Sequence, residues 1–383
     1  MQSDVPTIGA FCPTFLKPEM WHVYRQIVGP KRVQVEAFAF KRENPDRFPY
    51  PNIRLLHRSN FRWARRIWYQ QMLRSPQLAL PSECSAFQKS VRLYQIRLLH
   101  IYFGNNGVFW LPLFPNREIP IIVSFHGADV SVGFRTPAGK RRLQQVFAAA
   151  DLLLARSDSI RGSMIAAGCS QDKIRIQRTG IPTSEFRYRL RAFPDEGRFQ
   201  FLQACRLIEK KGVEVTLRAF TKFLLRWPNS RLAIAGDGPF RGHLEQLAEQ
   251  LQISRSVEFT GFLGKEQLLD RYYQSHFFVH PSETTLAGDN EGIPNSLLEA
   301  MATGLCSIAT RHGGIPEAIV HLRNGILVEE RDAEGVCHWM NELVENWQLA
   351  ADLGKQAAET ISREFDSETQ IQRLESTYLE LIR

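Results

Sequence analysis

The stretch from His280 to Glu317 constrains the fold of this 383-residue chain more than any other. It begins where the apolar run 277–279, which predicts a buried strand, comes to an end. A polar loop with several glycines leads to Pro294, which suits a first helical position, and residues 295–302 continue the helix to a glycine stop. The run 305–309 predicts the next buried strand. A strand, a helix and a strand in this order predict a parallel βαβ unit.

The loop in front of this helix has the chemistry of an anion site. The first backbone N–H groups of a helix have no partner within the helix, and together with the helix dipole they favour a negative charge such as phosphate. Glu291 in the loop and Glu299 on the helix flank this place. A carboxylate accepts from two neighbouring hydroxyls, which suits a ribose or a sugar. Taken alone, Glu299 is more simply a solvated helix residue; the pair together predicts a nucleotide-sugar site.

The length of the chain predicts two domains, since one ordinary core does not extend over 383 residues. No apolar run approaches the roughly 20 residues of a membrane span. The N-terminal segment lacks the basic and apolar regions of a signal peptide. The six cysteines form no CxxC pair, which favours reduced thiols and argues against a zinc site. We therefore expect a cytoplasmic protein that needs no metal cofactor.

Charge is distributed unevenly along the chain. Residues 1–190 contain 28 Lys and Arg against 12 Asp and Glu, whereas residues 191–383 contain 20 against 28. This asymmetry predicts that the first half meets an anionic partner. Nucleic acid, an acidic membrane surface and a phosphorylated acceptor all fit, and so does a basic face that only keeps the protein soluble.

The first half alternates short apolar runs with amphipathic segments. The predicted strands are 7–12, 33–40, 53–57, 98–103, 119–125, 152–155 and 173–177. The predicted helices between them include 18–28, 141–150 and 159–167. This alternation indicates parallel βαβ units and hence a doubly wound α/β domain over residues 1–182.

A second series of the same kind covers residues 198–364. Its predicted strands are 199–205, 231–235, 257–262, 277–280, 305–309 and 324–329. Residues 180–198, with turn residues at both ends and little periodicity, predict a linker between the domains. Residues 365–383 show helical spacing, and that helix fits against either domain.

Residues 59–74 predict a basic helix, capped by Ser59 or Asn60, with Phe61, Ala64, Ile67, Trp68 and Met72 on one face. Such a helix can lie in a membrane interface. An apolar stripe at this spacing more often packs on the sheet of its own domain, with the arginines in water. We place the core-packing interpretation somewhat ahead.

Three segments resemble retaining nucleotide-sugar glycosyltransferases of family four. Glu291 to Ala302 resembles the E-x7-E signature of that family, residues 205–212 (CRLIEKKG) resemble its R-L-x-x-x-K-G segment, and residues 125–129 (FHGAD) resemble its H-G-x-D segment. The resemblance covers most of residues 98–330. It implies the GT-B architecture, in which two Rossmann-like doubly wound α/β domains face each other across a cleft. The terminal helix 365–383 then packs back onto the first domain.

The resemblance also implies roles for individual residues. Arg206 and Lys211 hold the diphosphate of the donor, and guanidinium and ammonium groups suit phosphate oxygens. Glu299 accepts from the ribose, while Glu291 and His126 are the residues expected at the transferred sugar. The other expected donor contacts are backbone amides at Gly292, Asn295, Ser296 and Leu297.

In the first domain, Asp129 has two interpretations of equal weight. It binds a hydroxyl of the acceptor, or it caps the turn that follows the preceding strand.

The reaction implied is transfer of a sugar from a nucleoside diphosphate to an acceptor hydroxyl with retention of configuration, in polysaccharide or glycolipid biosynthesis. Fixed cations and amides stabilise the departing phosphate, and neither a metal nor a protein nucleophile is expected. The expected partners are a nucleotide-sugar donor, a sugar or lipid-linked acceptor and an anionic membrane touched peripherally at its inner face, with no nucleic acid. Two alternatives stay open: a nucleotide-sugar epimerase on the same fold, and a non-catalytic protein that binds anionic lipid or nucleic acid.

Overall fold

The computed structural model describes residues 5–17, 20–58, 62–131, 134, 136–194, 197–285 and 292–382. The chain divides into two compact units. The first contains residues 1–180 and 367–383, and the second contains residues 181–366. Within the described ranges, no helix is both long and apolar enough to cross a membrane.

The first unit is built on a sheet of seven parallel strands in the order β5-β3-β1-β6-β7-β8-β9. Almost every residue of β1, β3, β6, β7 and β8 is buried, as expected for strands covered on both faces. The strands are β1 (Thr7–Phe11), β3 (Gln34–Ala39), β5 (Ile53–Leu55), β6 (Ile96–Tyr102), β7 (Ile121–Phe125), β8 (Leu152–Ala155) and β9 (Ile174–Ile176). A separate pair joins β2 (Thr14–Phe15) to β4 (Lys41–Arg42).

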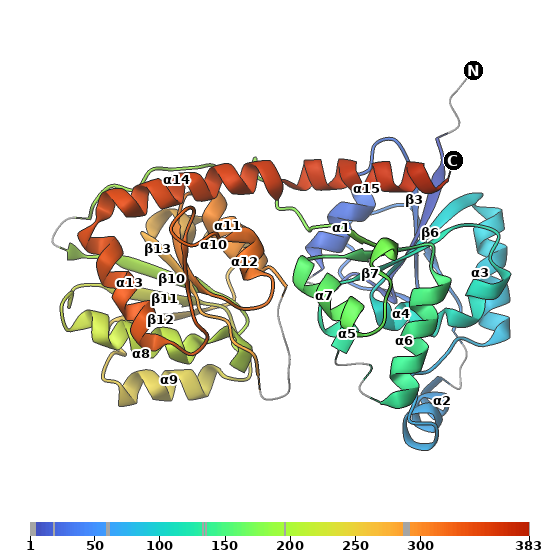
Figure 1. The fold of residues 1–383 in the computed structure, drawn as a ribbon, viewed down its shortest axis with the longest axis horizontal. Coiled ribbons are helices and arrows are strands. Elements are labelled where there is room, and N and C mark those ends of the chain that lie inside the picture. Colours follow the sequence, from blue (N-terminus) through green and yellow to red (C-terminus); the bar gives the residue numbers. More distant parts are fainter. Residues whose placement is uncertain are drawn as a thin grey trace. The chain divides into compact units, whose positions relative to one another are not determined.

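Helices cover both faces of this sheet (Figure 1). One apolar core joins the sheet to α3, α4, α6 and α7, and another joins it to α1 and α15. The helices of the unit are α1 (Trp21–Val28), α2 (Arg62–Ile67), α3 (Pro81–Leu93), α4 (Gly104–Phe109), α5 (Ala128–Ser131), α6 (Pro137–Ala149), α7 (Asp158–Ala166) and α15 (Ser367–Leu381). The predicted strands and helices therefore exist here, with ends that differ by a few residues.

The last helix, α15, belongs to the first unit, although the chain reaches it from the second. The Tyr378 hydroxyl lies 2.7 Å from Nδ1 of the buried His100 in β6. The Glu375 carboxylate accepts the backbone N–H of Arg32 at 2.5 Å. Buried hydrogen bonds of this kind fix α15 on the sheet, since leaving such groups unpaired would destabilise the fold.

The second unit contains six parallel strands in the order β12-β11-β10-β13-β14-β15. Helices α8, α9 and α13 share an apolar core with one face of the sheet, and α10, α11, α12 and α14 share another. The strands are β10 (Gln200–Ala204), β11 (Arg231–Ala235), β12 (Val257–Gly261), β13 (Phe277–His280), β14 (Cys306–Thr310) and β15 (Ile326–Val328). The helices are α8 (Val213–Leu224), α9 (Arg241–Gln250), α10 (Lys265–Gln274), α11 (Asn295–Ala302), α12 (Ile315–Ala318), α13 (Ala333–Glu345) and α14 (Trp347–Glu364).

The stretch expected as a linker, residues 180–198, packs on the second unit through Arg189 and Phe193. The backbone N–H of Arg189 donates to the Thr303 carbonyl, and its guanidinium lies 4.1 Å from the Tyr273 ring centroid. Phe193 meets Trp347 edge-on at 5.3 Å. These contacts could not be predicted from the sequence, because each depends on a single side chain in a segment without periodicity.

The basic segment near residue 62 is where the preferred sequence interpretation is wrong. It forms α2 followed by the π-helical turn η1 (Trp68–Met72), and α2 stands at the periphery of its unit (Figure 1). Large apolar side chains of the predicted face are not core: Ile67 is 44% exposed, Trp68 55% and Met72 66%. The predicted caps Ser59 and Asn60 lie outside the described residues. The change to π-helical geometry at Trp68 breaks the 3.6-residue stripe on which the core-packing interpretation depended.

Candidate functional site

The strand order of the second sheet determines where a ligand can bind. Numbered along the chain, its strands run 3-2-1-4-5-6, so the order reverses between β10 and β13. In doubly wound folds, ligands bind outside the carboxyl ends of the strands at such a reversal. The loops that follow β10 and β13 carry two of the three motifs singled out in the sequence, residues 205–212 and 291–302.

Glycines let these loops approach one another backbone to backbone. Gly212 has a φ of +60°, and a Cβ placed there would lie 1.8 Å from the carbonyl oxygen of Pro281, after β13. Gly236, after β11, has a φ of +142°, and its Cβ would lie 1.8 Å from the Cys205 carbonyl oxygen. Only glycine combines this backbone conformation with so close a contact. The loops after three neighbouring strands therefore form one packed edge.

Arg206 and Lys211 stand on this edge. Arg206 follows β10 by two residues and has an exposed side chain. Lys211 is half-buried and ends a 3-10 turn; its carbonyl accepts from the buried Gln203 of β10 at 2.8 Å. The strand and the turn therefore bring both cations to the carboxyl end of the sheet.

The N-terminus of α11 lies on the same edge. The Ser296 hydroxyl donates to the carbonyl of Ala204, the last residue of β10, at 2.6 Å. Pro294 is the residue before the helix rather than its first residue, and its side chain makes no capping hydrogen bond. The first turn, Asn295 to Leu297, therefore adds the field of a helix N-terminus beside Arg206.

Glu299 is oriented by a residue that the sequence did not reveal. The hydroxyl of the buried Tyr272, on α10, lies 3.0 Å from Oε2 of Glu299 and 3.2 Å from the Ser296 carbonyl. Burial, and then the neighbouring Glu299 carboxylate, raise the pKa of Tyr272 well above its usual value, so the hydroxyl stays a donor. In the sequence, Tyr272 is indistinguishable from a core aromatic of an amphipathic helix.

Glu291 lies outside the described residues, so its predicted contact with the sugar stays a prediction. The chain that leads toward it is held firmly. Thr284 donates its backbone N–H and its hydroxyl to the Glu330 carboxylate at 2.8 and 3.1 Å. The same carboxylate lies 2.7 Å from Nδ1 of the buried His312.

In the first unit, the Asp129 carboxylate closes the turn after β7. Oδ1 accepts the backbone N–H of His126 at 2.9 Å and of Gly127 at 2.8 Å, while Oδ2 accepts that of Gly104 at 2.9 Å. Burial raises the pKa of this carboxyl, against the opposing effect of these N–H donors. The capping interpretation of Asp129 is therefore confirmed, and its contact with an acceptor stays a prediction.

His126 follows β7 directly and is held neutral. Burial, followed by the neighbouring His22 and Arg156, lowers its pKa well below the ordinary value. Nε2 lies 3.1 Å from the Ser124 hydroxyl, and Nδ1 has no hydrogen-bond partner among the described residues. A buried, unpaired ring nitrogen is costly unless a ligand completes it, which suits a histidine that touches substrate.

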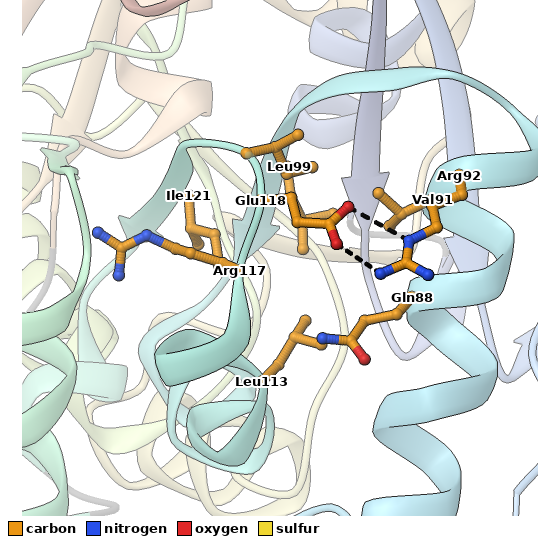
Figure 2. Close-up of a pocket in the computed structure, with 9 residues that line it drawn as sticks. Gln88, Val91, Arg92, Leu99, Leu113, Arg117, Glu118 and Ile121 are labelled. Carbon is orange, nitrogen blue, oxygen red and sulfur yellow. Dashed lines mark hydrogen bonds and ion pairs between the residues drawn. The ribbon is translucent and has the colours of Figure 1, made fainter.

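A small cavity in the first unit has none of these properties. Figure 2 shows it between α3 and the start of β7, and its volume is about 20 Å³. At its rim, Arg92 and Glu118 pair through two hydrogen bonds, of 3.2 and 2.5 Å. The walls are mainly apolar, and both arginines of the lining pair with carboxylates, Arg92 with Glu118 and Arg117 with Asp151. We assign no function to it.

Two doubly wound α/β units with parallel sheets are the architecture of the GT-B class of glycosyltransferases. The structure of Anabaena HepE in complex with UDP superimposes with a TM-score of 0.80, at 17% identity, over 98% of this chain and 100% of that one. In the described ranges, no group of three or more His, Cys, Asp and Glu side chains is placed to hold a metal ion.

The sequence comparisons identify the family. The model of glycosyl transferases group 1 matches residues 187–360, and that of glycosyltransferase family 4 matches residues 28–185. The chain belongs to the glycosyltransferases that these two models describe. The Escherichia coli K12 putative colanic acid biosynthesis glycosyltransferase WcaL is 32% identical over 277 residues, which are 70% of this chain and 66% of that protein. The Erwinia amylovora amylovoran biosynthesis glycosyltransferase AmsK is 31% identical over 68% of this chain and 64% of its own length. The chain thus spans less than two thirds of the length of these relatives.

Proposed function

We propose that this protein is a hexosyltransferase that moves a sugar from a nucleoside-diphosphate donor to an acceptor hydroxyl, with retention of configuration. The observation that carries the proposal is the meeting of Arg206, Lys211 and the N-terminus of α11 at the strand reversal of the second sheet. Relatives named for colanic acid and amylovoran biosynthesis support a role in polysaccharide or glycolipid assembly.

Each group at this edge has a place in the reaction. The diphosphate lies between Arg206, Lys211 and the amides of Gly292 and the first turn of α11. Glu299, oriented by Tyr272, accepts from two hydroxyls of the ribose. Cations and amides directed at the leaving phosphate stabilise the transition state more than the ground state, because negative charge builds there as the bond breaks.

At the sugar, Glu291 contacts hydroxyls and His126 lies near the anomeric carbon. A neutral His126 imidazole suits this position, because a protonated imidazolium would repel the positive charge that develops on the sugar. Retention then needs no protein nucleophile: the departing phosphate helps to deprotonate the acceptor hydroxyl on the same face. We propose that no metal takes part, since the two cationic side chains neutralise the diphosphate.

A panel of nucleotide sugars tests this function. The full chain is incubated with UDP-, GDP- and ADP-sugars, and both its melting temperature and the release of nucleoside diphosphate are measured. One base should raise the melting temperature, and nucleoside diphosphate should form slowly by hydrolysis without an acceptor. Interconversion of the free donor sugars would instead identify an epimerase, and absence of any shift would refute a nucleotide-sugar enzyme.

We further propose that the protein works in the cytoplasm at the inner face of a membrane and touches anionic lipid through residues 62–74. The first unit carries 28 Lys and Arg against 14 Asp and Glu, so it is strongly cationic. Within it, α2 and η1 expose Trp63, Trp68 and Met72 beside several arginines. Aromatic side chains with basic neighbours are typical of surfaces that lie in the headgroup region.

Replacing both tryptophans, Trp63→Ala with Trp68→Ala, should weaken binding to phosphatidylglycerol vesicles by about 10- to 30-fold, from the apolar area lost. Vesicle co-sedimentation at low and high salt measures this. The control is Leu225→Ala, because Leu225 is 87% exposed on the second unit and should not affect binding. Equal loss in both variants, or equal affinity for neutral phosphatidylcholine, would contradict contact through this segment.

A further inference from the structure

Two loops at the carboxyl end of the second sheet converge on a side chain that the donor chemistry does not use, that of Glu330. This residue follows β15, the edge strand, by two positions. Its carboxylate accepts the backbone N–H of Thr284 at 2.8 Å and the Thr284 hydroxyl at 3.1 Å, and it lies 2.7 Å from Nδ1 of the buried His312. Thr284 belongs to the loop after β13, and His312 to the loop after β14. One carboxylate therefore ties together the ends of three neighbouring strands.

The Glu330 carboxylate is charged and acts only as an acceptor. Burial would raise its pKa, but the Thr284 N–H and the His312 side chain together outweigh burial and hold the pKa below its ordinary value. A carboxylate has no hydrogen to donate, so Nδ1 of His312 carries the proton in this contact. Removal of the carboxylate would thus take an acceptor from three donors on two loops.

His312 connects this carboxylate to a turn that packs against the start of α11. The His312 carbonyl accepts the backbone N–H of Ile315 at 3.0 Å, which closes a tight turn. Gly314, within this turn, leaves no room for a side chain: a Cβ there would lie 3.0 Å from the carbonyl carbon of Gly292 and 3.1 Å from the backbone nitrogen of Ile293. A shift of His312 would therefore be passed to the backbone at Gly292.

Glu330 thereby acts on the chain both before and after Glu291, the residue proposed to contact the sugar. Thr284 precedes Glu291 in the sequence, and Gly292 follows it directly. Among the described residues, the hydrogen-bond partners of Glu330 are not the residues proposed to hold the diphosphate or the ribose. Its position thus favours an effect on the sugar end of the donor over an effect on the nucleotide.

The neighbouring Glu329 shows how an ordinary surface carboxylate behaves at this place. It lies 3.2 Å from Nε of Arg311, and its side chain is 75% exposed. Exposed pairs of this kind contribute little to stability. Glu330 differs because its side chain is only 30% exposed and because its partners are a backbone N–H, a hydroxyl and a fully buried histidine.

We propose that Glu330 is a positioning residue for sugar transfer: it holds the loop after β13 and, through His312, the start of α11 in the geometry in which the donor sugar reacts. The inference rests on the proposed transferase function, to which it adds a residue that acts without touching substrate. Misplacing a reacting group by about 1 Å can cost on the order of 100-fold in rate. The effect should therefore appear in turnover more than in nucleotide affinity.

The test is donor hydrolysis by the full chain, with the nucleotide sugar that the wild type hydrolyses as substrate and its free nucleoside diphosphate as the binding probe. Glu330→Ala should lower kcat by about 10- to 100-fold and weaken binding of the nucleoside diphosphate by no more than about threefold. Glu330→Gln should lower kcat by about 3- to 10-fold, because its amide oxygen still accepts from one of the two loops. If Glu330→Ala does not fold, Glu330→Gln carries the comparison.

Two controls separate positioning from stability. Glu329→Ala removes the same charge one residue away and should behave as the wild type does. Asn324→Ala, before β15, removes a buried side chain that accepts from Val320 at 2.7 Å and donates to Ala318 at 3.0 Å. It should lower the melting temperature about as much as Glu330→Ala and leave kcat unchanged at a temperature at which both variants are folded.

Loss of nucleoside-diphosphate affinity in proportion to kcat would overturn the proposal, since Glu330 would then support the nucleotide and not the sugar. Equal kcat in Glu330→Ala and Asn324→Ala would overturn it as well, because the hydrogen bonds of Glu330 would then serve stability alone. Both outcomes concern the variants. A wild type that neither binds nor hydrolyses any nucleotide sugar would instead refute the transferase function, and this inference with it.

Discussion

Arg206→Ala is expected to lower the efficiency of sugar transfer by about 100- to 1,000-fold, the range for removing one preorganised group that stabilises developing charge. Affinity for the nucleoside diphosphate should fall less, by about 10- to 100-fold, because the ground state carries less charge at the bond that breaks. The fold should be unaffected, since the Arg206 side chain is exposed.

Steady-state transfer kinetics and nucleotide titration of the same variants measure both effects. Arg206→Lys keeps the charge but loses the planar fork and should lie between the wild type and the alanine variant. Arg231→Ala is the matched control, because Arg231 is exposed at the opposite, amino end of β11. Unchanged nucleotide affinity in Arg206→Ala, with normal melting, would remove Arg206 from the donor site.

Gly212→Ala should destabilise the second unit by about 2–4 kcal/mol, from a left-handed backbone conformation and from overlap with a neighbouring carbonyl. The Cβ would lie 1.8 Å from the Pro281 oxygen, so the loops after β10 and β13 would have to separate. Because Lys211 precedes this glycine and α11 follows the other loop, donor binding should be lost together with stability.

Urea-induced unfolding and nucleotide titration measure the two parts of this prediction. Gly242→Ala is its control: Gly242 lies on α9, and a Cβ there would meet no atom within 4 Å. That substitution should stabilise the protein by up to about 1 kcal/mol, through helix propensity. Equal unfolding midpoints for the two variants would show that close packing of the loops does not hold the site together.

The sequence allowed prediction of those parts of the fold that depend on local periodicity. Alternating strands and helices predicted both sheets, and the helix after Pro294 was placed within one residue of its observed start. The strand orders could not be predicted, because long-range pairing leaves no local pattern. Arg206 and Asn295, the first residue of α11, are 89 residues apart in the sequence. The pairing of β10 with β13 brings them to the same edge of the sheet.

Other parts of the site depended on single contacts that no pattern encodes. Tyr272 reaches Glu299 from another helix, and its sequence context is that of an ordinary core aromatic. The role of Asp129 stayed evenly balanced until three backbone N–H groups were found on its carboxylate. The exposure of Ile67 and Trp68 was not predicted, because helical spacing indicates which residues share a face but not what that face contacts.

Amide hydrogen exchange of the full chain, with and without saturating UDP or GDP, tests the central claim most directly, since it locates the bound nucleotide. Exchange should slow at residues 206–212 and 292–299, where the diphosphate and ribose are proposed to lie, and should stay unchanged at residues 62–77. Slower exchange confined to the first unit would contradict this account, as would binding that leaves both loops of the second unit unprotected.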